Sequence, residues 1–194
     1  MGKTVVITGA AGGLGRVLSQ QLASEGWQLI VVSRDAERLK SAFGDAHQQI
    51  PADCTTPSGV AHLFAAIQER GLQPTALAHC IGSIRIGSLH RMSEADFNEC
   101  LGANLISAFH TLAGFVGALR EARSAGSAVF VSSAAARIGT PNHEAIAAAK
   151  GGLEALVRGA AASYASACIR INAVAPGIME TQAATGIICK LTGR

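Results

Sequence analysis

The sequence predicts one α/β domain built on a doubly wound parallel sheet, with helices on both faces in a three-layer α/β/α arrangement. Three observations lead to this prediction. Short apolar runs alternate along the chain with longer stretches of helical periodicity. The 194 residues suit a single domain, 1–194, with enough length for a real core. Apolar residues make up 49% and charged residues 15%, which is the balance of a globular chain and not of a disordered one.

Six strands are expected, and each is a short apolar run such as Val5-Val6-Ile7. In chain order they are expected at 3–8, 28–33, 48–50, 76–79, 128–132 and 170–174. No further strand is recognisable after Pro176-Gly177. The sheet is therefore expected to lack its last edge strand, which would leave the sixth strand as an exposed edge. Whether that end of the chain is natural is left open.

Helices are expected between the strands, because apolar residues there recur at three- and four-residue intervals. The first helix, for example, places Leu14, Leu18 and Leu22 on one face. In order, the helices are expected at 13–25, 36–43, 57–70, 94–101, 105–122 and 143–167. Right-handed crossovers would distribute them over both faces of the sheet.

Charge and cysteine content argue against several classes of protein. The net charge is only +3 and the basic residues form no run, so we expect no nucleic-acid partner. The five cysteines are odd in number and include no Cys-x-x-Cys pair, so neither a disulfide framework nor a metal site is indicated. The apolar run near the N-terminus is too short for a signal sequence or a membrane span. A cytoplasmic protein with no membrane partner is expected.

A glycine-rich turn follows the first strand and opens the first helix. Its candidate phosphate-binding residues are Gly9, Gly13, Leu14 and Gly15. Glycines let the backbone approach a pyrophosphate, and the free N–H groups of the helix N-terminus attract it. In this strand–turn–helix context the pattern predicts a Rossmann-like dinucleotide site. The alternative is a tight turn with a purely structural role.

The spacing Thr-Gly-x-x-x-Gly-x-Gly, from Thr8 to Gly15, resembles the short-chain dehydrogenase/reductase family, and further matches follow in the family's order over roughly 4–181. The resemblance implies an oxidoreductase that moves a hydride between a nicotinamide cofactor and a carbonyl or alcohol. We expect a small-molecule substrate whose identity the sequence does not reveal.

The end of the second strand indicates which nicotinamide cofactor is used. A carboxylate at this point favours NAD, because it binds the ribose 2′-hydroxyl. The chain has Ser33 there, followed by Arg34, whose guanidinium suits a 2′-phosphate. We therefore expect NADP(H) to be preferred over NAD(H). Alternatively Arg34 is an ordinary surface residue, partly neutralised by Asp35.

Other cofactor contacts are implied by the resemblance. Asp53 matches the family position beside the adenine ring, although it is also a plausible cap or turn residue before the next helix. Pro176 and Gly177 match the segment that lines the nicotinamide, and Thr181 matches the threonine that follows it. Gly82 is all that is kept of the family's Asn-Asn-Ala-Gly loop, which reads His79-Cys80-Ile81-Gly82 here.

Three residues match catalytic positions of the family. Asn104 would support a water near the catalytic lysine, Ser133 would orient the substrate carbonyl, and Lys150 would bind the nicotinamide ribose. Two of them have a simpler alternative. Asn104 could be a helical asparagine that is bonded locally, and Ser133 a strand-end hydroxyl that caps a turn.

The family's catalytic tyrosine is replaced, which makes this an atypical member. The family has Tyr-x-x-x-Lys, and the tyrosine position before Lys150 holds Ile146, which has no proton to exchange. The one tyrosine, Tyr164, would lie about 21 Å further along the helix at 1.5 Å per residue. His143 would share a face with Lys150 if the helix began early enough, but Asn142 looks like the N-cap and leaves His143 in an exposed first turn.

Two functions therefore stay open: an NADP(H)-dependent oxidoreductase with an impaired or altered proton donor, and a non-catalytic NADP(H)-binding sensor or assembly module. A scaffold without cofactor is least favoured. The helices expected at 105–122 and 143–167 are rich in Ala and Gly, and the family pairs such helices between subunits. A homodimer or homotetramer through these helices is expected.

Overall fold

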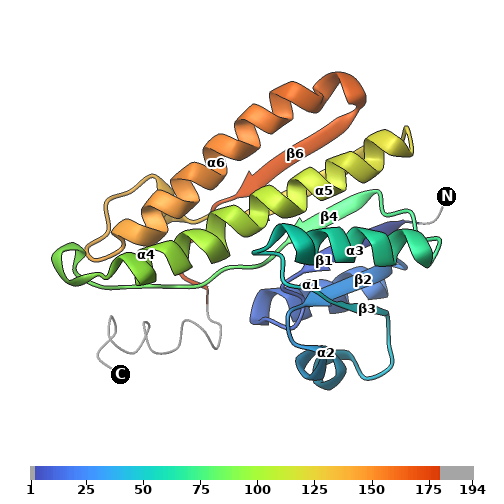
Figure 1. Cartoon of the computed structure of the whole chain (residues 1–194), viewed down its shortest axis with the longest axis horizontal. Helices are drawn as coiled ribbons and strands as arrows, with labels where there is room; N and C mark the ends of the chain where they lie inside the picture. The colour runs from blue at the N-terminus through green and yellow to red at the C-terminus, as the bar shows by residue number, and fades with distance from the viewer. Residues whose placement is uncertain (1–2, 180–194) are drawn as a thin grey trace.

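The structure, a computed structural model, describes residues 3–179, and the strands in this range form one six-stranded parallel sheet. They are β1 (Thr4–Thr8), β2 (Gln28–Ser33), β3 (Gln48–Pro51), β4 (Ala76–His79), β5 (Gly126–Val131) and β6 (Ile169–Val174). Their order across the sheet is β3-β2-β1-β4-β5-β6. Figure 1 labels every strand of this order except β5. The predicted doubly wound sheet is confirmed, and β6 is its edge within the described residues.

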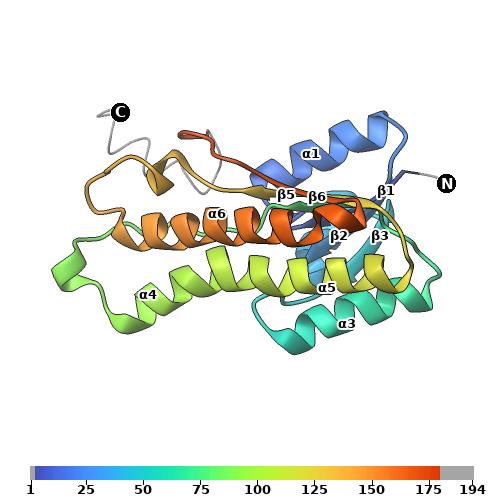
Figure 2. The same ribbon diagram turned by 90° about the horizontal axis from the view of Figure 1, so that it is seen from above.

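Helices cover the sheet in the predicted layers. They are α1 (Gly13–Ser24), α2 (Ala36–Phe43), α3 (Pro57–Glu69), α4 (Glu94–Leu101), α5 (Ser107–Glu121) and α6 (Glu144–Tyr164). Seen from above, α1 lies on one side of the sheet, and α3, α5 and α6 lie on the other (Figure 2). Alternate residues of each strand point to opposite faces, so the sheet supplies apolar side chains to both layers.

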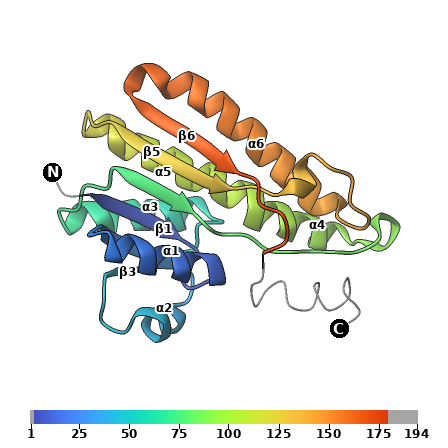
Figure 3. The same cartoon turned by 180° about the vertical axis from the view of Figure 1, so that it is seen from behind.

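Two apolar cores follow from this arrangement. On one face, Val6 and Ile30 pack with Leu63 of α3 and Phe115 of α5. On the other, Val5, Ile7, Leu29 and Val31 pack with Leu39 of α2 and with half-buried leucines of α1. From behind, α1 stands in front of β1–β3, whereas no described helix covers β5 and β6 (Figure 3).

The helices over 94–121 form one continuous run, which differs from the two separate helices that the sequence predicts. A π-helical turn, Gly102–Ile106, joins α4 to α5. The run Glu94–Glu121 is long and apolar enough to cross a membrane by length and composition alone. Its apolar side chains Leu112, Phe115 and Leu119 are nevertheless buried in the core against the sheet, which accounts for that composition.

The start of the last helix also differs from the prediction. Asn142 is not the N-cap: its backbone is left-handed, with φ of 61°, and His143 is the N-cap of α6. His143 therefore has non-helical backbone angles and stands before the first helical residue of α6. At the other end α6 stops at Tyr164, and a 3₁₀ turn, Ala165–Ala167, leads into β6.

The strand order reverses between β1 and β4, because β1 has β2 on one side and β4 on the other. At such a point the connections leave the sheet in opposite directions and open a crevice beyond the carboxyl ends of the strands, where ligands bind in folds of this kind. Thr8 and His79 are the last residues of these two strands and are paired in register.

Candidate active site

The glycine-rich turn leaves the N-terminus of α1 open. Helices α2, α3 and α4 are capped by the side chains of Asp35, Thr56 and Ser93. Helix α1 begins instead after Gly12, without a side-chain cap and without an acidic residue in its first turn. Its free N–H groups and positive dipole end therefore face the crevice beside β1, which suits an anionic pyrophosphate.

Two glycines of this turn tolerate no side chain. Gly9 has a φ of +70°, and a Cβ on it would lie 2.8 Å from the carbonyl carbon of Cys80 and from the amide nitrogen of Ile81. A Cβ on Gly15 would lie 2.4 Å from the carbonyl oxygen of Gly9. The turn is thus pressed against the residues after β4, and the backbone forms a closed cradle that fits the phosphates of a dinucleotide.

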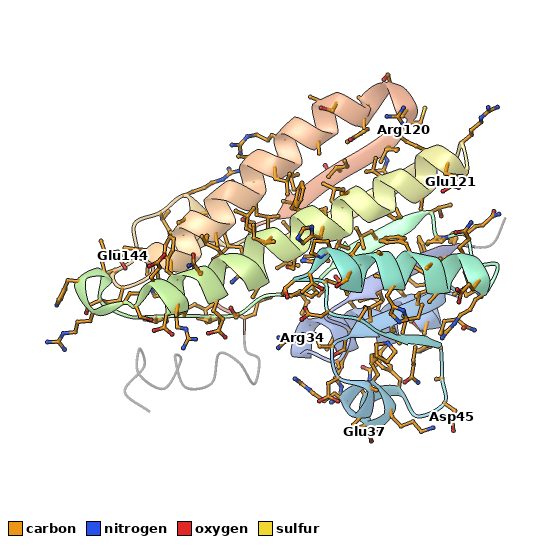
Figure 4. All side chains as sticks on the ribbon, viewed as in Figure 1. Arg34, Glu37, Asp45, Arg120, Glu121 and Glu144 are labelled. Carbon is orange, nitrogen blue, oxygen red and sulfur yellow. The ribbon has the colours of Figure 1, made fainter. Side chains whose placement is uncertain are left out.

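The residues predicted for the adenosine end gather at the ends of β2 and β3. The amide of Ala52 donates to the carbonyl oxygen of Ser33, which joins the two strand ends. Arg34 is exposed beside α1 (Figure 4). Burial raises the pKa of Asp53, but hydrogen bonds from Thr55 and the positive charge of Arg34 outweigh it and leave this pKa below its ordinary value.

Asp53 also has a local structural role. Its carboxylate accepts from the amide and the hydroxyl of Thr55, at 2.9 and 2.7 Å. The helix cap proper is Thr56, which accepts from the amide of Gly59. Asp53 is therefore a turn residue, as the alternative prediction had it, and it lies beside Arg34 as an adenosine-contacting residue would.

At the other end of the crevice, Asn104 links the middle helix to the loop after β4. Its amide nitrogen donates to the carbonyl oxygen of Ser83 at 3.0 Å and to that of Cys100 at 2.9 Å. The amide of Ser83 donates back to Oδ1 of Asn104 at 3.3 Å. The bond to Cys100 is the local one that the alternative prediction describes, but the bonds to Ser83 reach across the site. Asn104 sits in the π-helical turn, and such turns are frequent at functional sites.

Gly82 brings Asn104 and Lys150 to one place. A Cβ on Gly82 would lie 3.1 Å from Oδ1 of Asn104 and 3.6 Å from Nζ of Lys150. The absence of a side chain at Gly82 therefore keeps the space between these two polar groups open. These three predicted residues come together although they are far apart in the sequence.

Lys150 is a buried cation with a single hydrogen bond among the described residues. Its side chain points from α6 to the end of β5, where Nζ donates to the carbonyl oxygen of Val131 at 2.6 Å. Only 6% of the residue is exposed. Burial lowers the pKa of Lys150 to about 8, and negative charge on Cys100 or Cys80 would act in the opposite direction. The other two N–H bonds of the ammonium are available to a ligand.

Ser133 follows β5 at the same edge of the sheet. Its hydroxyl accepts from the amide of Ala135 at 3.2 Å and caps a 3₁₀ turn, Ala134–Ala136, as the alternative prediction describes. That bond leaves the hydroxyl proton free to bind a substrate oxygen. Pro176 lies close by, because its carbonyl oxygen accepts from the amide of Ala134. Gly177 follows in the described part of the chain, and Thr181 lies outside the described residues.

Ile146, at the family's tyrosine position, is buried in an apolar cluster with 6% of its surface exposed. It packs with Cys100, Ala145 and Ala149, and Phe97 of α4 borders the cluster. No dissociable proton is present at this position.

Neither sequence-based substitute for the tyrosine is hydrogen-bonded to Asn104, Ser133 or Lys150 in the described part of the chain. Nδ1 of His143 is bonded to the carbonyl oxygen of Pro141 at 2.7 Å, at the surface. Tyr164 is the last residue of α6, at the end of the helix away from Lys150, and packs against the core.

His79 forms a buried link that sequence reasoning missed. Nδ1 lies 2.9 Å from the hydroxyl of Thr8, and Nε2 lies 3.2 Å from the hydroxyl of Ser107. Because Ser107 donates its proton to the carbonyl oxygen of Ala103, it must accept from Nε2–H, and Nδ1 must accept from Thr8. Burial, and secondarily the charge of Lys150, lowers the pKa of His79 to about 3, so the ring is neutral.

His79 stands where the family's Asn-Asn-Ala-Gly loop begins with asparagine. It connects the end of β1, where the phosphate-binding turn starts, to the π-helical turn that carries Asn104. The one signal in the sequence is a polar residue that ends an apolar strand.

A second missed residue is Glu154, which lies one turn beyond Lys150 on α6 and is buried. The hydroxyl of Ser132 donates to its Oε1 at 2.9 Å, and Nε of Arg137 donates to its Oε2 at 2.9 Å. The hydrogen bond from Arg137, with that from Ser132, holds the pKa of Glu154 below its ordinary value. Glu154 thus holds Ser132 and Arg137, the residues on either side of the segment 133–136.

Comparisons with known proteins agree with this geometry. Residues 3–189 match the family described as short chain dehydrogenase. The chain is 29% identical over 184 residues to the 3-oxoacyl-[acyl-carrier-protein] reductase MabA of Mycobacterium bovis, covering 92% of this chain and 70% of that protein. It is 30% identical over 192 residues to a (3R)-3-hydroxyacyl-CoA dehydrogenase of Canis lupus familiaris, covering 91% and 73%.

A solved structure is similar as well. A variant of ElxO with NADPH bound superposes with a TM-score of 0.89 at 25% identity, over 99% of this chain and 80% of that one. The family match covers most of the chain, and the sheet order is that of a Rossmann-like fold. The chain is a member of the short-chain dehydrogenase family of NAD(P)-dependent oxidoreductases.

Proposed function

We propose that the protein is an NADP(H)-dependent oxidoreductase that interconverts a carbonyl and an alcohol on a small molecule. The observation that carries this proposal is the convergence of Asn104, Gly82 and Lys150 at the carboxyl ends of the central strands. A bound reduced nicotinamide supplies the hydride to the carbonyl carbon. Lys150 and Asn104 hold polar groups toward that end of the crevice, and Ser133 offers a hydroxyl for the carbonyl oxygen.

The preference for NADP(H) is supported by Arg34. It is exposed at the end of β2 and forms no ion pair with any described carboxylate. The neighbouring carboxylate of Asp35 is used instead to cap α2, where it accepts from the amide of Arg38. A guanidinium in this position can form charge-assisted hydrogen bonds with a 2′-phosphate. The ElxO structure with bound NADPH is a further indication.

The relatives suggest a class of substrate to try first. Two of those reported above are named as a 3-oxoacyl-[acyl-carrier-protein] reductase and a (3R)-3-hydroxyacyl-CoA dehydrogenase. Acetoacetyl-CoA is a simple member of that class and is our first probe. The cytoplasmic location expected from the sequence stays a prediction.

The second candidate function is a non-catalytic NADP(H)-binding module, and the burial of Ile146 favours it. The phenol that gives the family its proton donor is replaced by an apolar side chain packed against α4. General acid–base catalysis typically contributes about 10²–10⁴-fold to a rate. Binding without turnover is therefore the outcome if no other group takes over this role.

The experiment that tests the cofactor site is a titration with NADPH and with NADH, followed by the fluorescence of the reduced nicotinamide. Trp27 is a poor reporter, because it precedes β2 and so lies at the opposite end of that strand from Ser33. We expect NADPH to bind more tightly. Arg34→Ala should weaken NADPH binding by about 10–100-fold, since a hydrogen bond to a charged group contributes about 1.5–3 kcal/mol. NADH binding should be unchanged.

Arg120→Ala is the matched control, because Arg120 is an exposed arginine at the far end of α5 (Figure 4). It should bind both cofactors as the unsubstituted protein does. If neither cofactor binds, both candidate functions are wrong. If Arg34→Ala weakens NADPH and NADH equally, Arg34 does not recognise the 2′-phosphate.

A further inference from the structure

We propose that Lys150 itself is the proton donor for the carbonyl oxygen, in place of the phenol that Ile146 replaces. The inference rests on the proposed oxidoreductase function and assigns a new role to a residue of that site. It is carried by the position of Nζ at the end of β5, by its unused N–H bonds and by the failure of every neighbouring described group to qualify.

The position of Nζ suits this role. It is bonded to the carbonyl oxygen of Val131, two residues before Ser133, so the ammonium and the carbonyl-binding hydroxyl lie at the end of one strand. It also borders the open space beside Gly82. Its remaining N–H bonds meet no acceptor among the described residues, so a substrate oxygen is a natural partner.

The nearby thiols and imidazole do not compete. Cys80 packs against the cluster on the α1 face of the sheet, and although the charge of Lys150 acts on it, burial raises its pKa to about 11. Cys100 is buried beside Ile146 and interacts with the amide of Asn104, and burial raises its pKa too. His79 is neutral, and both of its ring nitrogens are hydrogen-bonded within the core.

The charge environment of Lys150 suits proton release. The titratable groups that interact with its charge are His79 and Cys80 of the β4 end and Cys100 of α4. The carboxylate of Glu154, one turn further along α6, is bonded to Ser132 and Arg137 and forms no ion pair with Lys150. An ion pair would hold the proton on the amine, whereas burial without such a partner favours the neutral amine. The resulting pKa of about 8 is close to neutral pH, where a general acid is most effective.

The step balances with a nicotinamide reductant. The carbonyl carbon receives a hydride with its electron pair from the reduced nicotinamide, which becomes oxidised. The carbonyl oxygen receives a proton from the Lys150 ammonium, which becomes a neutral amine. The N–H bond breaks as the O–H bond of the alcohol forms, and water then reprotonates the amine.

The first test measures the protonation of Lys150 directly, without turnover. The protein contains four lysines, Lys3, Lys40, Lys150 and Lys190, so a sample labelled with ¹³C at lysine Cε gives few NMR signals. The Lys150 signal is assigned by its loss in Lys150→Arg. We expect it to titrate near pH 8. A midpoint near the ordinary lysine value of about 10.4 overturns the proposal.

The second test follows reduction of acetoacetyl-CoA and a panel of other carbonyl compounds by NADPH as a function of pH. The rate should be level at low pH and fall about tenfold per pH unit above the NMR midpoint, because the ammonium is then lost. Oxidation of the corresponding alcohol should show the opposite trend and rise toward that pH. A reduction rate that is flat through the midpoint overturns the proposal.

The third test separates proton donation from simple charge. Lys150→Arg keeps a cation and hydrogen-bond donors, but a guanidinium does not release its proton at these pH values. We expect NADPH binding to persist and reduction to fall by roughly 10²–10⁴-fold. Lys40→Arg, at an exposed lysine of α2 paired with Asp45, is the matched control and should leave reduction unchanged.

The outcomes separate this inference from the proposed function. Turnover in Lys150→Arg within tenfold of the unsubstituted protein overturns the inference and leaves the oxidoreductase function standing. If the unsubstituted protein binds NADPH but reduces no carbonyl compound, both the inference about Lys150 and the oxidoreductase function are overturned, and the binding module is favoured. If Lys150→Arg loses its fold by circular dichroism, the NMR midpoint and the pH profile of the unsubstituted protein still decide.

Discussion

Replacing Gly9 by alanine should destabilise the protein through two separate effects. The backbone of Gly9 is left-handed, with φ of +70°, and an L-residue in that region costs roughly 1–2 kcal/mol. The new Cβ would also lie 2.8 Å from backbone atoms of Cys80 and Ile81, and overpacking of this kind costs roughly 1–3 kcal/mol. The expected loss of unfolding free energy is therefore roughly 2–5 kcal/mol, out of the roughly 5–15 kcal/mol of a typical domain.

Two matched variants isolate the two effects. Gly26 has a similar φ of +80° but nothing lies within 4 Å of its would-be Cβ, so Gly26→Ala should lose only roughly 1–2 kcal/mol. Gly15 lies in α1, and its would-be Cβ is 2.4 Å from the carbonyl oxygen of Gly9. Gly15→Ala should therefore show the overpacking effect alone, roughly 1–3 kcal/mol.

The assay is urea unfolding followed by circular dichroism, with NADPH affinity measured on the same samples. Gly9→Ala should show the largest loss of stability and should weaken NADPH binding, because the turn can no longer rest against the end of β4. Gly26→Ala should bind NADPH normally. If Gly9→Ala loses no more stability than Gly26→Ala, the reasoning is wrong, because the contact between the turn and Cys80 would then be easily relaxed.

Two further predictions concern the core and the outer helices. His79→Leu should cost roughly 1–3 kcal/mol, because the buried Thr8 hydroxyl loses its acceptor. Since the folded-state pKa of His79 is depressed to about 3, its contribution to stability is present above about pH 6.5 and is lost as the pH falls toward 3. Urea unfolding at pH 7 and pH 5 should therefore show a larger drop for the unsubstituted protein than for His79→Leu, and equal drops would contradict the burial. The predicted homodimer or homotetramer should be visible by light scattering, and Phe109→Glu should shift it toward the monomer, because 49% of Phe109 is exposed on α5. A monomeric mass for the unsubstituted protein would refute that prediction.

The sequence by itself determined the fold and the place of the glycine-rich turn and of the proposed cofactor residues along it. Apolar runs and helical periodicity are local properties, and right-handed crossovers leave few ways to arrange six parallel strands. The glycine spacing from Gly9 to Gly15 follows from the backbone requirements of a phosphate-binding turn, so it is readable without coordinates. Ser33 ends a strand and Arg34 follows it, which places both at the carboxyl edge of any such sheet.

Only the tertiary structure decided the chemistry at the other end. His79 joins Thr8 to Ser107, 71 and 28 residues away in the sequence, and its tautomer follows from bonds that no pattern reveals. The direction of Ile146 into an apolar cluster and the burial of Lys150 without an ion pair to a described carboxylate depend on how α4, α6 and β5 pack. The N-cap of α6 was predicted one residue too early, because Asn142 is left-handed and His143 takes that position. Proton affinity depends on desolvation and on neighbouring charges, and both are set by groups that are distant in the chain and adjacent only in the folded protein.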